Sequence, residues 1–228
     1  MPLFYYFDPT VLIVLPALIF TFWAQINVNS TFEKYSKVKT KSNMTGYDSA
    51  RRILDANGLY DVSVEMVGGN LTDHYDPRAN VIRLSEGVYH STSAAAVGVA
   101  AHEAGHAVQY AKGYFPIKVR QAIIPVSRIG SSLAIPLFLI GLLLAVPALA
   151  YVGIAFYSLA VVFQLITLPV EFNASRRAME ALDGGVLDRR ELDASAKVLR
   201  AAALTYVAAL ASSLLSLLRL IAIVNRRR

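Results

Sequence analysis

AAHEAGHAVQ, at residues 100–109, is the stretch that says most about the fold and chemistry of this 228-residue chain. His102 and His106 are four residues apart, so on a helix both imidazoles project from one face and can share a cation. Zn²⁺ accepts such neutral nitrogen ligands. Glu103 lies about 100° around the helix from His102, where its carboxylate can take a proton from a water that attacks a peptide carbonyl. The pattern therefore predicts a helical zinc site for peptide-bond hydrolysis, with Glu103 as general base.

The flanking sequence favours a well-defined helix around this motif. Residues 91–93 (Ser-Thr-Ser) supply N-cap candidates, an alanine-rich run continues to about Lys112, and Gly113 can end the helix. The segment 94–111 is about one bilayer long, but two histidines and a glutamate near its middle make insertion into lipid costly. We therefore expect a buried helix of a catalytic domain.

A small sheet is expected ahead of this helix. After a short helix at 45–59, apolar and polar residues alternate at 62–66 and again at 80–85, which is typical of half-buried strands. The Gly-Gly-Asn turn at 68–70 separates them, so the sequence predicts a small antiparallel sheet. Segment 80–84 is either the edge strand that pairs with an extended peptide substrate or an ordinary strand of the sheet.

The composition is that of a membrane protein. Hydrophobic residues make up 55% of the chain and charged residues only 17%, too little polar surface for a water-soluble globule of this size. The chain has no cysteine, so any metal ligand must be His, Asp or Glu. The net charge of +6 comes mostly from Lys and Arg beside apolar runs, and no nucleic-acid-binding motif is present. We therefore expect these basic side chains to face the anionic headgroups of a lipid bilayer, and not nucleic acid.

Apolar runs of about bilayer length divide the chain. They cover 10–28, 129–146, 151–170 and 201–224, and the middle two are separated only by a short link, as in a membrane hairpin. We expect five parts: an N-terminal transmembrane anchor at 1–28, a catalytic domain at 29–128, a transmembrane hairpin at 129–170, a helical segment at 171–200, and a C-terminal apolar helix with a basic tail at 201–228.

The distribution of Lys and Arg predicts the orientation. None precedes Thr10, whereas twelve lie in 29–128 and six in 171–200. Since Lys and Arg near the spans favour the cytoplasm, we expect a multi-pass protein of the cell membrane with its catalytic side cytoplasmic. The last run either spans as well or stays on the cytoplasmic side, and its length favours four spans.

A catalytic zinc site needs a third protein ligand and an open position. No histidine follows His106, so the third ligand is expected to be a carboxylate from elsewhere. Glu171 is the preferred candidate, because the hairpin returns the chain to the side of the motif just before it. Glu180 and Asp183 are the alternatives, although either can belong to a solvated helix face.

Four pieces of sequence resemble the YugP-like neutral zinc metallopeptidase family of bacterial membrane proteins, and more distantly the HtpX and CAAX-prenyl proteases. They are LTDHYDP at 71–77, IRLS at 82–85, the motif at 100–109, and PVEFNASRRA at 169–178. The resemblance implies a mainly α-helical membrane protein with a zincin-like, gluzincin-type catalytic domain. It also implies one Zn²⁺ per chain held by His102, His106 and Glu171, with Glu103 as base.

The resemblance to HtpX is incomplete at Ser175, where that family has an Asp that looks like a group orienting a zinc-bound histidine. Ser175 or Asn173 is the expected substitute. His74 and Arg176 are candidates for stabilising the oxyanion; a hydrogen-bonded turn and a helix salt bridge are the respective alternatives.

The function expected from motif and resemblance together is that of a membrane-embedded zinc endopeptidase. Its substrates would be membrane or membrane-proximal proteins and peptides, cleaved in protein quality control. The alternative is a catalytically silent zinc-binding membrane protein that holds client proteins, and the intact Glu103 favours the enzyme.

Overall fold

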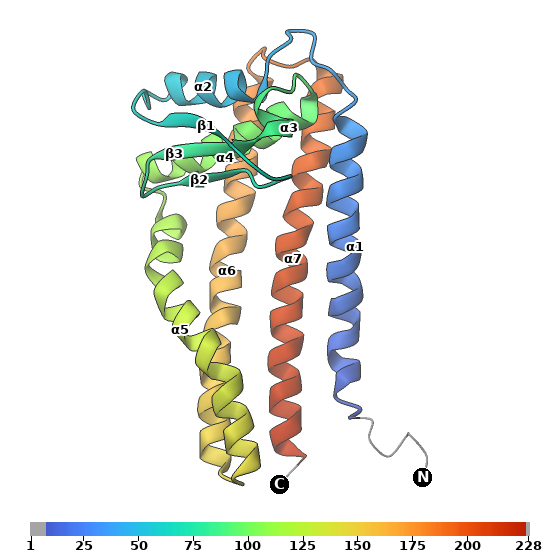
Figure 1. Cartoon of the computed structure of the whole chain (residues 1–228), viewed down its shortest axis with the longest axis vertical. Coiled ribbons are helices and arrows are strands. Elements are labelled where there is room, and N and C mark those ends of the chain that lie inside the picture. Colours follow the sequence, from blue (N-terminus) through green and yellow to red (C-terminus); the bar gives the residue numbers. More distant parts are fainter. Residues whose placement is uncertain (1–7, 227–228) are drawn as a thin grey trace. The chain divides into compact units, whose positions relative to one another are not determined.

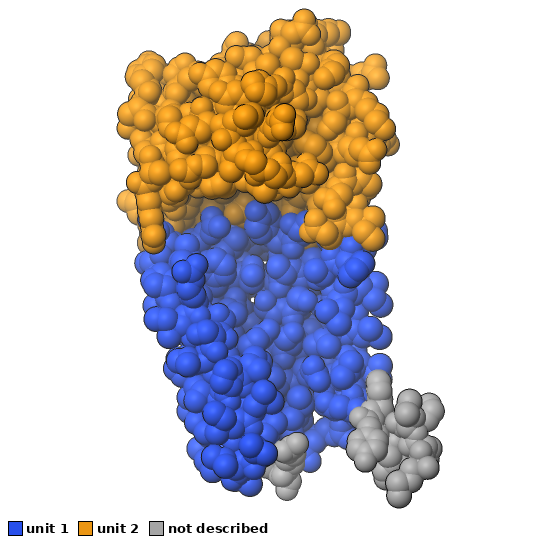
Figure 2. Space-filling model, viewed as in Figure 1, with its two compact units in different colours: residues 1–24, 119–168, 205–228 blue, residues 25–118, 169–204 orange. Residues whose placement is uncertain are grey.

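The structure, a computed structural model, describes residues 8–226 and is mainly helical (Figure 1). The chain forms two compact units, coloured separately in Figure 2. Unit 1 comprises residues 1–24, 119–168 and 205–228, and unit 2 comprises 25–118 and 169–204. The elements in order are α1 (Val11–Tyr35), α2 (Gly46–Ala56), β1 (Ser63–Val67), β2 (His74–Asp76), β3 (Val81–Ser85), α3 (Glu86–Tyr89), α4 (Ala94–Ala111), α5 (Phe115–Leu143), α6 (Pro147–Asp183) and α7 (Arg189–Asn225).

Within the described residues, helices α1, α5, α6 and α7 are long and apolar enough to cross a membrane. Many of their apolar side chains are exposed, among them Leu18, Phe22 and Leu139, as expected for a surface that lipid covers. The sequence places the link between the two hairpin helices at 147–150, but the structure places it earlier in the chain. The turn occupies 144–146, and Pro147 begins α6, because proline suits the first position of a helix.

Close backbone packing holds α5 and α6 together in unit 1. A Cβ at Gly153 would lie 2.6 Å from the Phe138 amide nitrogen, and a Cβ at Gly141 would collide with the Ala150 backbone. Small residues at such crossings let membrane helices approach closely. The hairpin therefore depends on glycines at its interface.

The sheet in unit 2 is mixed, so the predicted antiparallel sheet is wrong. Its strand order is β1-β3-β2, with β1 parallel and β2 antiparallel to β3. The physical reason is that 68–73 is a crossing loop rather than a tight hairpin turn, with Gly69 and Leu71 at positive φ. Strand β3 is central, which excludes 80–84 as an edge strand, and β2 is an edge strand instead.

Helix α4 runs through the core of unit 2. Ser93 caps its first turn by accepting a hydrogen bond from the Ala96 amide, and Gly113 follows its end at positive φ, which confirms the predicted helix. Its buried alanines pack with residues of α2, β3 and α6. Short side chains let neighbouring elements approach the helix that carries the motif.

Candidate metal centre

His102, His106 and Glu171 converge in unit 2. Nε2 of His102 lies 3.3 Å from Glu171 Oε2, and Nε2 of His106 lies 3.4 Å from the same oxygen. One potential ligand atom from each residue lies within 4.8 Å of the others. Glu171 is 2% exposed and both imidazoles are largely covered. Two imidazole nitrogens and one carboxylate oxygen are a donor set that suits zinc.

Glycine at position 105 explains how α6 reaches the motif. A Cβ on Gly105 would lie 2.7 Å from the Ala174 carbonyl oxygen, so the backbones of α4 and α6 touch there. On α6, Glu171 lies about one turn before this crossing and Ser175 directly follows Ala174. The motif helix therefore meets the two α6 side chains that contact its histidines.

The remaining nitrogen of each histidine is also engaged. Nδ1 of His102 lies 3.1 Å from Ser175 Oγ, and Nδ1 of His106 lies 3.0 Å from Gln109 Oε1. Metal-binding histidines commonly use the second nitrogen in this way, which orients the ring. Since both Nε2 atoms point at the Glu171 carboxylate, the side chains fit a bound Zn²⁺.

Negative charge dominates the electrostatics around His106. Burial alone would lower the pKa of His106, but its hydrogen bond with Glu171 and the charges of Glu103 and Glu171 outweigh burial and raise it. The same carboxylates that favour an imidazolium would also favour a divalent cation.

Glu103 is buried beside the cluster and has a second carboxyl as neighbour. Asp73, at the end of the crossing loop, accepts hydrogen bonds from the amide and hydroxyl of Ser85. Burial raises the pKa of Asp73, and the charge of Glu103 adds to this, while the Ser85 hydrogen bonds lower it. Asp73 thus ties the start of β2 to the end of β3, near the predicted base.

The other predicted residues lie outside the cluster. His74 is exposed on edge strand β2, and its Nδ1 lies 2.8 Å from the Thr72 carbonyl oxygen. Arg176 and Glu180 are 3.9 Å apart on the surface of α6, with both side chains 68% exposed. Asp183 is exposed at the end of the same helix. Neither alternative carboxylate joins the two histidines.

Gln109, which is fully buried, was not predicted to take part in the site. Gln109 lies three residues after His106, and side chains at this spacing are neighbours on a helix. The spacing alone could therefore have predicted their contact. Asn173, one of the two expected partners, contacts Gln109 rather than a histidine, whereas Ser175 does contact His102.

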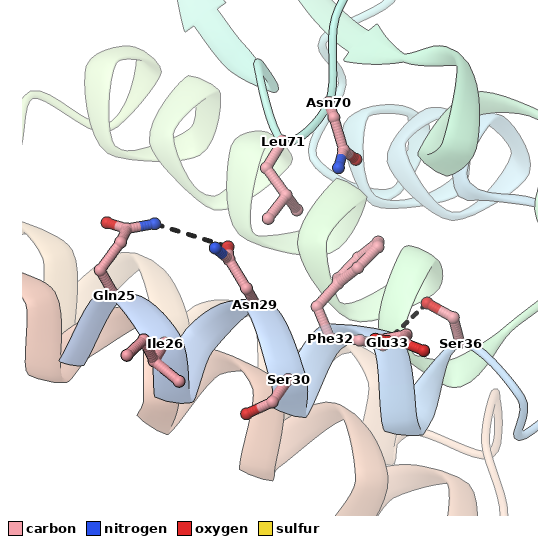
Figure 3. A pocket seen from close by; sticks show the side chains of 9 residues that line it. All are labelled: Gln25, Ile26, Asn29, Ser30, Phe32, Glu33, Ser36, Asn70 and Leu71. Atoms are coloured by element: carbon pink, nitrogen blue, oxygen red, sulfur yellow. Dashed lines mark hydrogen bonds between the residues drawn. The ribbon is translucent and has the colours of Figure 1, made fainter. Parts of the chain in front are cut away.

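A separate cavity of about 830 Å³ lies between α1 and the loop at Asn70 and Leu71 (Figure 3). Polar side chains of α1, including Gln25 and Asn29, line one wall of it. None of its lining residues is a candidate metal ligand.

Comparison with known proteins relates the chain to zinc peptidases. A family model described as "Putative neutral zinc metallopeptidase" matches residues 10–225. The "Putative membrane protease YugP" of Bacillus subtilis (strain 168) is 52% identical over 214 residues, which cover 93% of this chain and 95% of that protein. No solved structure matches the chain.

Proposed function

This chain belongs to the family of neutral zinc metallopeptidases, and on that premise we propose that it is a multi-pass membrane endopeptidase that uses one Zn²⁺. Its substrates would be membrane or membrane-proximal proteins, cleaved in protein quality control. The observation that carries the proposal is the convergence of His102, His106 and Glu171 next to Glu103.

Each residue of the centre has a distinct role in this proposal. His102, His106 and Glu171 would hold the zinc ion. When bound, zinc would polarise the peptide carbonyl and lower the pKa of a water molecule. Glu103 takes the proton of the attacking water and delivers it to the leaving amine nitrogen. One peptide C–N bond is broken and one water is consumed.

Edge strand β2 carries a further candidate residue, His74. The strand lies against α4, and the rings of Tyr75 and Tyr110 are 5.6 Å apart across that contact. Because His74 is exposed on β2, we retain it as the candidate that stabilises the oxyanion. Arg176, exposed beside Glu180 on α6, has less geometric support.

The test is casein cleavage by purified full-length protein, compared with the variant Glu103→Gln. We expect this variant to keep its zinc and to lose activity by about 10²–10⁴-fold, the worth of positioned proton transfer. Glu180→Gln, on the exposed face of α6, is the matched control and should cleave like wild type. A zinc-loaded wild type that cleaves nothing would support the silent, client-holding alternative.

A further inference from the structure

We propose that Gln109 is a positioning residue of the metal centre that fixes which nitrogen of His106 faces the metal, and that Arg177 holds Gln109 in this orientation through Asn173. This inference rests on the proposed zinc site and adds three residues to it.

The contacts form one continuous chain between α4 and α6. Arg177 Nε donates to Asn173 Oδ1 at 2.8 Å, and Gln109 Nε2 donates to the same oxygen at 3.0 Å. Gln109 Nε2 also donates to the Val170 carbonyl at 2.8 Å. Gln109 Oε1 then faces His106 Nδ1 at 3.0 Å.

Donor and acceptor chemistry sets the direction of this chain. A guanidinium only donates, so the oxygen of the Asn173 amide, and not its nitrogen, must face Arg177. That oxygen and the Val170 carbonyl only accept, so both require the NH₂ group of Gln109. The Gln109 oxygen is thereby left for His106, whose Nδ1 must carry a hydrogen. In a neutral imidazole this leaves the lone pair on Nε2, the nitrogen that faces Glu171.

Burial makes this arrangement consequential. Gln109 is 0% exposed and Asn173 is 6% exposed, so an amide turned the wrong way would leave buried groups unsatisfied. His102 differs in this respect, because its partner is the Ser175 hydroxyl, which rotates and can donate or accept. The series of hydrogen bonds that starts at Arg177 therefore orients His106 and not His102.

Zinc affinity of the purified full-length protein, measured by chelator competition, tests the proposal without depending on activity. Gln109→Met keeps the size of the side chain but removes its polar groups, and should weaken zinc binding about 10–100-fold, the usual cost of losing such a partner. Gln109→Glu keeps an acceptor for His106 but loses the NH₂ group that Val170 and Asn173 require, so it should recover only part of that loss. The absorption spectrum of the Co²⁺-substituted protein should change in Gln109→Met and return towards wild type in Gln109→Glu.

Two adjacent arginines provide the matched control. Arg177→Met should weaken zinc binding up to about tenfold, Arg177→Lys should restore it, and Arg176→Met should leave it unchanged. Equal zinc affinity in Arg177→Met, Arg176→Met and wild type would overturn the role of Arg177. Equal weakening in Gln109→Glu and Gln109→Met would overturn the role of Gln109. A wild type that binds no metal would instead overturn the proposed function together with this inference.

Discussion

Glu171 is the residue that most directly tests the proposed metal centre, because it is the one proposed ligand that comes from a different helix than the motif. Its Oε2 lies within 3.4 Å of both histidine Nε2 atoms. We expect Glu171→Ala to weaken zinc binding by more than about 100-fold, beyond the usual cost of losing an outer partner. Glu180→Ala and Asp183→Ala should keep stoichiometric zinc, since both side chains are exposed. If zinc is retained in Glu171→Ala but lost in Glu180→Ala, then Glu180, and not Glu171, is the third ligand.

Local spacing was enough to predict His102, Glu103 and His106 as one group, since helical geometry alone places them together. Glu171 required an argument about the hairpin. Asp73 could not be predicted, because its partner Ser85 becomes a neighbour only when β2 pairs with β3. Arg177 was missed in favour of Arg176, although Asn173 and Arg177 are one helical turn apart.

The crossing of α4 and α6 is the critical contact between elements. Gly105→Ala would place a Cβ 2.7 Å from the Ala174 carbonyl oxygen, and backbone atoms cannot move aside easily. We expect a loss of about 1–3 kcal/mol in unfolding free energy from overpacking. Zinc binding should also weaken, because Glu171 and Ser175 move with α6. Thermal unfolding and chelator competition would measure the two effects.

Gly87→Ala is the control for this substitution. Gly87 lies in α3 of the same unit, and a Cβ there would meet nothing within 4 Å. It should leave both unfolding and zinc affinity near wild type. If Gly105→Ala behaves like Gly87→Ala, the close packing of α4 against α6 does not hold the site together.

Helices were easier to predict than strand pairing. The cap at Ser93 and the breaker at Gly113 are local signals, and the structure confirms the helix that they delimit. The sheet is mixed because 68–73 crosses to the far side of β3, and a loop of that length leaves strand order open. Alternation identified strands at 62–66 and 80–85 but could not establish their neighbours.

At the scale of the whole molecule, the first and last parts of the described residues, 8–226, are linked within unit 1. Asp8 lies 3.6 Å from Arg219 and 3.7 Å from Arg226, and Arg219 also donates to Thr10. The start of α1 and the end of α7 therefore lie at the same end of that unit. Arg219, which interrupts the last apolar run, has its partners there.

This link favours four spans with both chain ends on one side. We expect reporter fusions after Lys41 and Arg200 to report the cytoplasm, since Lys and Arg concentrate in those segments. A fusion after Arg228 should report the outside, despite the basic tail. If the fusion after Lys41 or the fusion after Arg200 reports the outside, the predicted orientation is wrong. If the fusion after Arg228 reports the cytoplasm, the chain crosses the membrane three times and not four.

Zinc dependence of the whole enzyme tests the central claim most directly. Purified protein should be stripped with a chelator, titrated with Zn²⁺, and assayed for casein cleavage at each step. We predict no cleavage by the metal-free protein, and activity that rises to a break at one zinc per chain, as one site made by His102, His106 and Glu171 requires. Cleavage that persists in metal-free protein, or a break at another stoichiometry, would contradict the account.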